Sequence, residues 1–392
     1  MFRTIDECFS QIQNGVNIKQ GEIDGGYPIT RIETTANDKF NRDRMGYAGI
    51  KDISSYKAYV LEDDDLLMSH INSVQYLGRT VLYEKQGDEI VIHGMNLLRL
   101  KAKQNIIIPA YAKYCFYGHS FRSKISNITK KSVNQASFAV SDLKKIIINI
   151  PDLHEQAAIV RILNGINEII EKRQRELLIL DKLIKARFVE MFGDFIENSK
   201  GWKIVNLRDL TKVGSSKRIF EKEYVSSGIP FYRTKEIVEL SKGNRVSTEL
   251  FISEERFSEI KEQFGVPQRG DLLISAVGTI GVIWIVDGKN DFYFKDGNLI
   301  RIDASKKFDS IFMKYLLEGM INEYKKRMSA GTAYSALTIS GLSEMNVYDV
   351  PLGMQKKFSI FVQQVDKSKF VVQQALDKTQ LLFDSLMQKY FG

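Results

Sequence analysis

Several residue types are scarce in this chain of 392 residues, and each shortage excludes a class of protein. Two cysteines, Cys8 and Cys115, are too few for a disulfide framework or a four-cysteine metal site. The four histidines have no metal-ligand spacing, so we expect no bound metal. The longest apolar run, 272–286, is too short to span a bilayer and reads better as two buried strands joined by a turn. We therefore expect a cytoplasmic protein with no membrane partner.

Catalytic motifs are also scarce. Among the six prolines there is no Pro-Pro pair, which excludes the Asn/Asp-Pro-Pro-Tyr-like loop of an adenine methyltransferase. The only Gly-Lys pair, Gly288-Lys289, precedes Asn290 and does not form a phosphate-binding loop. Gly278-Thr-Ile-Gly281 lies in an apolar stretch and favours a hairpin turn over a phosphate site. Glu259-Ile-Lys261 is similar to a nuclease motif, but no Pro-Asp strand precedes it. We expect no catalytic residues and no cofactor bound by this chain.

What the chain has is a long heptad pattern after Pro151. Between 151 and 193 the apolar residues step alternately by four and three, which predicts one helix of roughly 33 residues and about 50 Å. Two polar residues, Arg173 and Arg187, interrupt the seam. The seam consists of Ile159, Leu163, Ile166, Ile170, Leu177, Leu180, Ile184 and Met191. Such a helix needs a partner along its length.

The same pattern recurs at the C-terminal end. With Gln156 aligned to Gln355, the two stretches run without a gap to Phe192-Gly193 and Phe391-Gly392. The second seam consists of Phe358, Val362, Val365, Val372, Leu376, Phe383, Leu386 and Tyr390, with Lys369 and Thr379 as its polar steps. Two matched seams in one chain can pair with each other, although this does not exclude a further partner. The chain therefore contains an internal repeat, whose unit is about 200 residues long.

The stretches before the helices are also duplicated. Gly228-Ile-Pro-Phe-Tyr-Arg233 echoes Gly26-Tyr-Pro-Ile-Thr-Arg31, and Gly297-Asn-Leu-Ile-Arg-Ile302 echoes Met95-Asn-Leu-Leu-Arg-Leu100. Short runs rich in β-branched and aromatic residues predict strands at 27–32, 80–83, 89–93, 96–100 and 146–150, with a helix at about 110–126 and a loop at 127–141. We predict an α+β fold with two tandem strand-rich domains at 1–150 and 197–350. Two long α-helices, in 151–196 and 351–392, form an antiparallel intramolecular coiled coil with pseudo-twofold symmetry.

These features together resemble the specificity (S) subunit of type I restriction-modification systems over essentially the whole chain. The resemblance rests on the helix starts at Pro151 and Pro351 with their glutamines, the Phe-Gly helix ends, and Gly201-Trp-Lys-Ile-Val-Asn-Leu-Arg-Asp-Leu210. Gly228-Ile-Pro230 and Gly278-Thr-Ile-Gly281 add to it. The first domain lacks the Trp-Lys lead-in and opens directly at Phe2-Arg-Thr-Ile-Asp6, and Asn72–Gly78 stands in place of the Gly-rich turn.

The resemblance implies a non-catalytic, bacterial or archaeal subunit whose two target-recognition domains each read half of a split target in double-stranded DNA. The helices would set the half-site spacing and dock two methyltransferase (M) subunits, which carry S-adenosylmethionine. Restriction/translocase (R) subunits, with ATP and Mg²⁺, would join for restriction. The net charge of +8 suits a polyanionic partner, but the excess is spread along the chain without a basic tail.

DNA-binding proteins contact phosphates and base edges mainly through Lys, Arg, Asn, Gln, Ser and Thr. In the first domain the candidates are Lys19, Gln20, Arg31, Asn41, Arg42, Arg44, Arg122, Lys124, Lys130, Lys131, Asn134 and Gln135. In the second they are Ser215, Ser216, Lys217, Arg218, Arg233, Lys235, Lys325, Lys326, Arg327, Thr332 and Tyr334. Any one of them is as readily a solvated loop residue, but we expect the set to make contact.

Two alternatives stay open on the sequence alone. One is a specificity subunit that serves a fused restriction-methylation enzyme of the type II kind, which the gene neighbourhood would distinguish. The other is a coiled-coil scaffold carrying two ligand-binding domains without DNA affinity. The scaffold predicts no salt-dependent DNA binding, whereas phosphate contacts predict an affinity that falls steeply with added salt.

Overall fold

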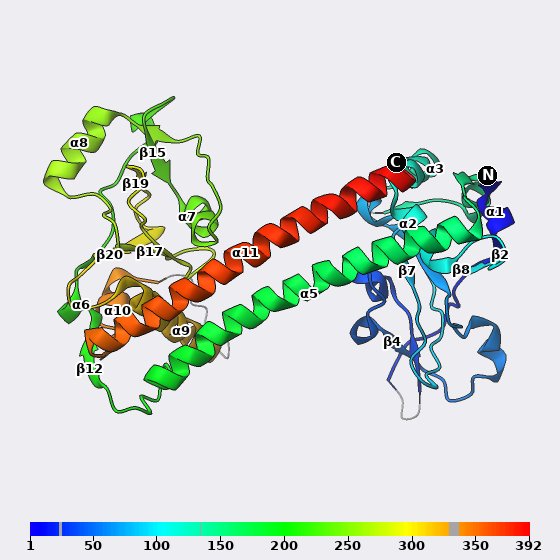
Figure 1. The fold of residues 1–392 in the computed structure, drawn as a ribbon, viewed down its shortest axis with the longest axis horizontal. Coiled ribbons are helices and arrows are strands. Elements are labelled where there is room, and N and C mark those ends of the chain that lie inside the picture. The colour runs from blue at the N-terminus through cyan, green and yellow to red at the C-terminus, as the bar shows by residue number, and fades with distance from the viewer. Residues whose placement is uncertain (23–25, 134, 329–336) are drawn as a thin grey trace. The chain divides into compact units, whose positions relative to one another are not determined.

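The computed structural model describes the chain apart from residues 23–25, 134 and 329–336 and the side chains at 324, 327 and 328. The chain divides into two compact units: Met1–Gln174 with Gln374–Gly392 (unit 1), and Arg175–Gln373 (unit 2). Each unit holds one mixed α/β globule and part of each long helix (Figure 1). No helix among the described residues combines the length and apolar character needed to cross a membrane.

Unit 1 is built on a four-stranded antiparallel sheet in the order β2-β8-β5-β7. These strands are β2 (Phe9–Asn14), β5 (Leu66–Ser69), β7 (Thr80–Leu82) and β8 (Leu97–Ala102). Smaller sheets pair β1 (Phe2–Thr4) with β11 (Ile147–Asn149), β3 (Tyr27–Ile29) with β4 (Gly46–Ala48), and β10 (Ala136–Ser137) with both β6 (Ile71–Asn72) and β9 (Lys130–Lys131). The helices are α1 (Ile5–Cys8), α2 (Pro109–Tyr117), α3 (His119–Ile128) and α4 (Val140–Lys145), with short 3₁₀ turns η1 (Ile32–Asp38), η2 (Arg42–Arg44), η3 (Ser54–Tyr59) and η4 (Val74–Tyr76).

Unit 2 repeats this plan with the antiparallel sheet β13-β20-β17-β18. These strands are β13 (Val213–Gly214), β17 (Leu272–Ser275), β18 (Ile283–Ile285) and β20 (Leu299–Ile302), and β12 (Lys203–Asn206) pairs with β21 (Asn346–Asp349). A second sheet, β14-β16-β15-β19, joins β14 (Tyr224–Val225), β16 (Phe251–Ile252), β15 (Ile229–Tyr232) and β19 (Tyr293–Phe294). The helical segments are α6 (Leu207–Leu210), η5 (Glu221–Glu223), α7 (Thr234–Ser241), α8 (Glu254–Gln263), α9 (Ser310–Met328) and α10 (Ile339–Ser343).

The internal repeat is visible element by element. In both units the first strand pairs with the last, β1 with β11 and β12 with β21, so unit 1 has the same edge despite lacking the Trp-Lys lead-in. A one-turn helix with a capping box follows that first strand, formed by Thr4 with Glu7 in unit 1 and by Asn206 with Asp209 in unit 2. The predicted strand pair in 272–286 is confirmed as β17 and β18.

The long helices α5 (Leu153–Phe192) and α11 (Leu352–Phe391) have 40 residues each, or about 60 Å at 1.5 Å per residue. They pack together antiparallel. In unit 1 the Arg173 guanidinium donates to Ala375 O and Thr379 Oγ1, and in unit 2 Lys369 Nζ lies 2.6 Å from Asp181 Oδ1. Partner numbers on α11 therefore fall as those on α5 rise (Figure 1).

The ends of both helices are built into the cores of the units. In unit 1, Ile159 and Leu163 of α5 and Phe391 of α11 are buried in one cluster, where the Phe391 ring lies 5.2 Å from that of Tyr111. In unit 2, four phenylalanine rings gather with centroids 4.8–5.8 Å apart: Phe188, Phe192, Phe312 and Phe358. This burial supplies the apolar stabilisation that an isolated long helix lacks.

Four local predictions need correction. The helix expected at 110–126 is broken at Gly118, because Phe391 packs against the glycine backbone where any side chain would overlap it. No strand forms at 89–93, where Ile92 makes only single bridges to Ile29 and Val60. The expected loop at 127–141 contains the last two residues of α3, the strands β9 and β10, and the first two residues of α4. At the end of the α5 seam Phe188 and Phe192 are fully buried while Met191 is not, because a straight helix drifts from a strict heptad.

Candidate nucleic-acid interface

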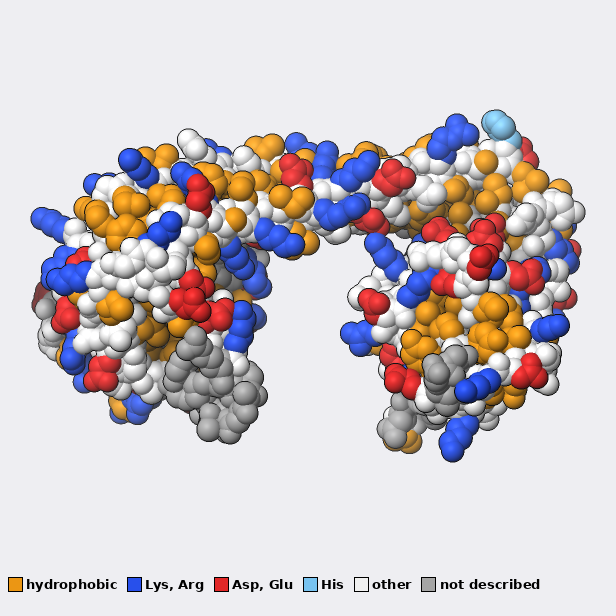
Figure 2. Space-filling model, turned by 90° about the horizontal axis from the view of Figure 1, so that it is seen from below, with side chains coloured by type: hydrophobic (Ala, Val, Ile, Leu, Met, Phe, Trp, Pro, Cys, Tyr) orange, Lys and Arg blue, Asp and Glu red, His pale blue; other side chains and the backbone are white. Residues whose placement is uncertain are grey.

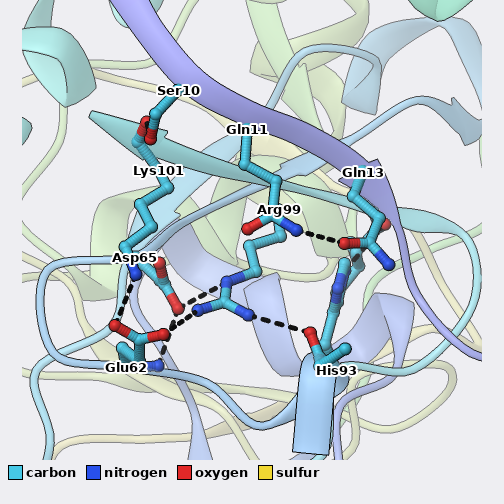
Figure 3. A network of polar contacts seen from close by, with 10 residues as sticks. Ser10, Gln11, Gln13, Glu62, Asp65, His93, Arg99 and Lys101 are labelled. Atoms are coloured by element: carbon cyan, nitrogen blue, oxygen red, sulfur yellow. Dashed lines mark hydrogen bonds and ion pairs between the residues drawn. The ribbon is translucent and has the colours of Figure 1, made fainter. Parts of the chain in front are cut away.

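Each main sheet has an ion pair between a strand arginine and a buried aspartate. In unit 1 the Arg99 Nε atom on β8 lies 2.7 Å from Asp65 Oδ2, and both residues are almost wholly inaccessible to solvent. Arg99 also approaches Glu62, which pairs with Lys101 at 2.5 Å (Figure 3). Burial raises the pKa of the Asp65 carboxyl, against the bond from Glu62 N and the charge of Arg99. Arg99 therefore stabilises the sheet from inside and is no ligand contact.

Unit 2 repeats the pair with looser geometry. Arg301 on β20 has its Nε 3.9 Å from Asp271 Oδ2 and 2.7 Å from Asp303 Oδ1. Asp271 accepts from Gln268 N as Asp65 accepts from Glu62 N, and burial again raises the pKa of this carboxyl. Both pairs lie on the main sheet of their unit, since Arg99 is on β8 and Arg301 is on β20.

Arg31 and Gln20 come together in unit 1. Arg31 precedes η1, where its N–H donates to Thr34 Oγ1 at 2.8 Å, and its side-chain Nε donates to Gln20 Oε1 at 2.5 Å. Both residues are exposed, and they line one hollow. Lys19 is also exposed, and its carbonyl accepts from Gly49 N.

The corresponding arginine in unit 2 is Arg233. It precedes α7, its N–H donates to Glu236 Oε2 at 2.9 Å, and its guanidinium lies 3.3 Å from Glu236 Oε1. Lys235 follows it on the exposed side of α7. Arg31 and Arg233, which match in sequence, therefore also occupy similar places in the structure. Their neighbours differ, because Arg233 lies beside the Glu236 carboxylate and Arg31 beside the Gln20 amide.

The 41–44 segment has mixed roles. Asn41 caps η2 by accepting from Asp43 N, and Arg44 is exposed. Arg42 instead makes two hydrogen bonds to Glu89 and lies over the Tyr83 ring at 5.8 Å. The Arg42 bonds lower the pKa of Glu89 to about 2. Arg42 therefore has a structural partner of its own, while Arg44 is open to a ligand.

The basic residues of α3 point to the backbone of their own unit. The Arg122 guanidinium donates to Leu77 O, and Lys124 Nζ donates to Ile147 O at 2.7 Å. By contrast, Lys130, Lys131 and Gln135 are exposed on the β9–β10 hairpin. Of the described candidates in this group, those on the hairpin are the exposed ones.

The 215–218 loop of unit 2 is exposed at its basic residues. Ser215 Oγ donates to Leu299 O, and the Ser216 hydroxyl is buried without a partner among the described residues. Lys217 lies 5.1 Å over the Phe264 ring, and Arg218 pairs with Asp296 at 2.7 Å. The sequence gives no sign that Phe264 lies beside Lys217, because the tertiary fold brings the two residues together.

The remaining candidates lie at the end of α9 and beyond. Lys325 Nζ donates to Ile280 O, and burial lowers the pKa of its ammonium group. Lys326 is exposed and pairs with Glu323. Asn134, Thr332, Tyr334 and the Arg327 side chain lie outside the described part of the chain.

The candidate set thus divides into exposed and interior residues. On the face seen in Figure 2, Lys and Arg side chains are interspersed with Asp and Glu on both globules and do not form one basic field. Among the described residues no three His, Cys, Asp or Glu side chains gather into a metal-binding cluster. Glu33, Met95 and Asn96 also line the hollow beside Arg31, although they are not among the residues predicted from the sequence. For Met95 and Asn96, the sequence signal is the similarity of 95–100 to 297–302.

The family model of the type I restriction modification DNA specificity domain matches residues 2–179 and again 199–378. The chain belongs to this family. The MjaX specificity subunit of a Methanocaldococcus jannaschii type I restriction enzyme is 27% identical over 386 residues, covering 93% of this chain and 86% of that protein.

Two further likenesses agree with this assignment. The EcoKI specificity subunit of Escherichia coli is 25% identical over 157 residues, covering 40% of this chain and 33% of its own. The crystal structure of the S subunit from M. genitalium covers 100% of this chain and 96% of its own at a TM-score of 0.58 and 17% identity, which shows the shared fold. The predicted family and the predicted fold class are therefore both confirmed.

Proposed function

We propose that this specificity subunit recognises a bipartite sequence in double-stranded DNA without catalysing a reaction. Each globule would read one half of the target. The duplicated domain-plus-helix architecture carries this proposal, because two similar surfaces suit two half-sites. Arg31 and Arg233, exposed at corresponding places in the two copies, support it at the level of side chains.

The proposal assigns two tasks to the α5–α11 pair. One is to set the spacing of the half-sites, since each helix is continuous for about 60 Å against ~34–36 Å for one turn of DNA. The other is to dock two methyltransferase subunits. Leu178 and Ile179 on α5 and Phe370, Val371 and Leu381 on α11 are each more than half exposed, which suits burial by a partner.

The cofactors belong to the partners in this proposal. S-adenosylmethionine would bind the M subunits, and ATP with Mg²⁺ would bind the restriction subunits that join for cleavage. Adenine methylation at both half-sites would then depend on this chain for its sequence and on the M subunits for its chemistry. The complex would work in a bacterial or archaeal cytoplasm.

The test compares methylated adenines in the source genome with and without this gene, followed by binding of the chain–M complex to the mapped sequence. The proposal expects one bipartite motif to lose methylation, and duplex binding that prefers this motif and weakens steeply with salt. A complex that binds all duplexes equally would refute it.

The spacing task has a separate test. One heptad is inserted after Gln174 in α5 and one after Gln373 in α11, which keeps the antiparallel partners opposite each other. Seven residues lengthen a helix by about 10 Å, or about three base pairs, and nearly preserve its facing. The gap of the methylated motif should grow while both half-sites stay the same. Changed half-sites with an unchanged gap would contradict the spacing task.

A further inference from the structure

A hollow of about 250 Å³ opens on unit 1 beside Arg31. Its polar lining includes Asn17, Gln20, Glu33 and Asn96, and Met95 adds an apolar side chain that is 41% exposed. These residues come from three separate stretches of the chain, 16–20, 30–33 and 95–96. The hollow is therefore a product of the tertiary fold.

The walls of this hollow are fixed by backbone pairing. Gln20 bridges Ala48, the last residue of β4, and β4 pairs with β3, which ends two residues before Arg31. Thr30 is buried, and its hydroxyl accepts from Gly94 N at 2.9 Å, next to Met95. All three stretches are thus tied to one another, which holds their side chains in one geometry.

Arg31 is held from two sides. Its Nε donates to Gln20 Oε1, and its guanidinium lies against the α-carbon of Gly46, where a side chain would overlap it. Neither terminal nitrogen, Nη1 or Nη2, makes a hydrogen bond or ion pair with a described residue. A guanidinium fixed at Nε presents these two nitrogens as a paired donor edge.

The lining favours a base edge over a phosphate as the occupant. Glu33 adds a carboxylate, which would repel a phosphate oxygen but can accept from an exocyclic amine. Asn17 and Asn96 offer both donors and acceptors, and Met95 offers apolar contact of the kind a thymine methyl group fits. Such a mixture matches the varied edges in the major groove, whereas a phosphate site would be uniformly donating.

We infer that this hollow is a base-reading subsite in which Nη1 and Nη2 of Arg31 donate to O6 and N7 of a guanine in the half-site of the first domain. The inference rests on the proposed DNA recognition and adds the base and the residue that reads it. Gln20 is the positioning residue that holds the guanidinium, and Gly46 provides the space behind it.

Unit 2 marks the limit of the inference. Arg233 occupies the corresponding place, but Glu236 lies beside its guanidinium at 3.3 Å and engages one terminal nitrogen. The same paired donor edge is therefore not presented there, and a guanine contact is inferred for Arg31 alone.

The test uses the full chain in complex with its M subunits and duplexes carrying the mapped motif. Each guanine of the first half-site is replaced in turn by 7-deazaguanine, which lacks the N7 acceptor. Wild type should lose about tenfold in affinity at one position, the order expected for a bidentate arginine–guanine contact. Arg31→Ala and Arg31→Lys should bind the unmodified motif about tenfold more weakly and show no further loss at that position.

Lys57→Gln, a charge loss at an exposed residue of η3 that does not line the hollow, is the matched control and should keep the full 7-deazaguanine penalty. Two results would identify a charge contact and overturn the inference. One is wild-type affinity of Arg31→Lys for the motif, and the other is an unchanged 7-deazaguanine penalty at every guanine in Arg31→Ala. A first half-site without guanine would also overturn it. In these outcomes sequence preference persists, so they are distinct from a complex without sequence preference, which would refute the proposed function itself.

Discussion

The two units share a topology but differ in how their sheets hold a buried charge. In unit 1 Arg99 is 2% exposed and lies 2.7 Å from Asp65. In unit 2 Arg301 is 3.9 Å from Asp271 and turns toward Asp303, which is nearer the solvent. The repeat has therefore kept the arginine and the buried aspartate, while the second acidic partner differs: Glu62 stands where unit 2 has Gln268, and Asp303 stands where unit 1 has Lys101. A shared sequence position predicts which groups meet, but the strength of their interaction depends on the surrounding packing.

The largest difference should appear when the two arginines are removed in turn. Arg99→Met leaves Asp65 buried without its counter-charge, which costs about 3–5 kcal/mol when a buried pair is broken. Arg301→Met should cost about 1–2 kcal/mol, because its nearer partner Asp303 stays partly hydrated. Hydrogen exchange of β8 and β20 amides, read by mass spectrometry in each variant, measures the two losses separately.

A double variant provides the control. Arg99→Met with Asp65→Asn removes the stranded charge and should recover part of the loss, whereas additive losses would mean that the two side chains are not coupled. Equal destabilisation of the two units by the single variants would show that the difference between 2.7 and 3.9 Å has no energetic weight.

The glutamines at the helix starts give the next comparison. Gln156 accepts from Ile108 N and donates to Ile106 O and Pro151 O, whereas Gln355 accepts from Asp309 N and donates to Val350 O. Both are buried, so a leucine leaves backbone groups unsatisfied at about 1–3 kcal/mol. Gln156→Leu should destabilise its unit somewhat more than Gln355→Leu.

Exchange at the first turns of α2 and α9 reports these losses, since the glutamines bind the backbone just before each helix. Glutamate in place of each glutamine keeps the acceptor and loses the donors, and it should cost less for Gln355 than for Gln156. A greater loss from Gln355→Leu would reverse the comparison.

The features that the sequence predicted are those repeated within it. Apart from Met191, the paired seams, the Gln156–Gln355 alignment and the strand pair at 272–286 formed as expected, because each depends on a local pattern or on its own copy. The helix break at Gly118 could not be predicted, since Phe391 packs there from 273 residues further along the chain. Sequence patterns therefore predict an element correctly where its packing partner is close in the chain or is a copy of the element itself.

The candidate site was harder to predict than the fold. Arg31, Arg42 and Arg122 look alike in sequence, as arginines in polar stretches. Their roles diverge because Glu89 lies beside Arg42 and the Leu77 carbonyl beside Arg122, while the Arg31 side chain bonds, among the described residues, only to the Gln20 amide. Each of these partners is distant in the chain, so a sequence pattern alone cannot separate interior from exposed arginines.

Acid should distinguish the units through Glu89. Arg42 lowers its folded pKa to about 2 from a usual 4.5, so the ionised carboxylate stabilises unit 1 above pH 4.5. That contribution, on the order of 1–2 kcal/mol after allowance for partial exposure, is lost as the pH falls from about 4.5 to about 2. Asp65 and Asp271 both have raised pKa values and so do not create a difference between the units.

The measurement is hydrogen exchange of unit 1 and unit 2 peptides between pH 5 and pH 3, corrected for intrinsic rates. Glu89→Gln should remove the additional acid sensitivity of unit 1 and leave unit 2 unchanged. If the substitution left the pH response of unit 1 intact, the Arg42–Glu89 pair would not be its source.

The smallest expected effects are those of the ion pairs that fasten other segments to α5. Lys39–Glu171 in unit 1 and Lys369–Asp181 in unit 2 are both 2.6 Å long, but the Lys369 side chain is 30% exposed and that of Lys39 is 66% exposed. Exposed pairs contribute about 0.2–1 kcal/mol, so Lys369→Met should cost more than Lys39→Met within that range. Double-mutant cycles with Asp181→Asn and Glu171→Gln, read by exchange of the α5 peptides, measure each coupling.

Raising the salt from 0.05 to about 0.5 M should abolish the Lys39 coupling first, because water and ions screen the more exposed charge. If the Lys39 pair had the larger or more salt-resistant coupling, solvent exposure would not be what ranks these two contacts.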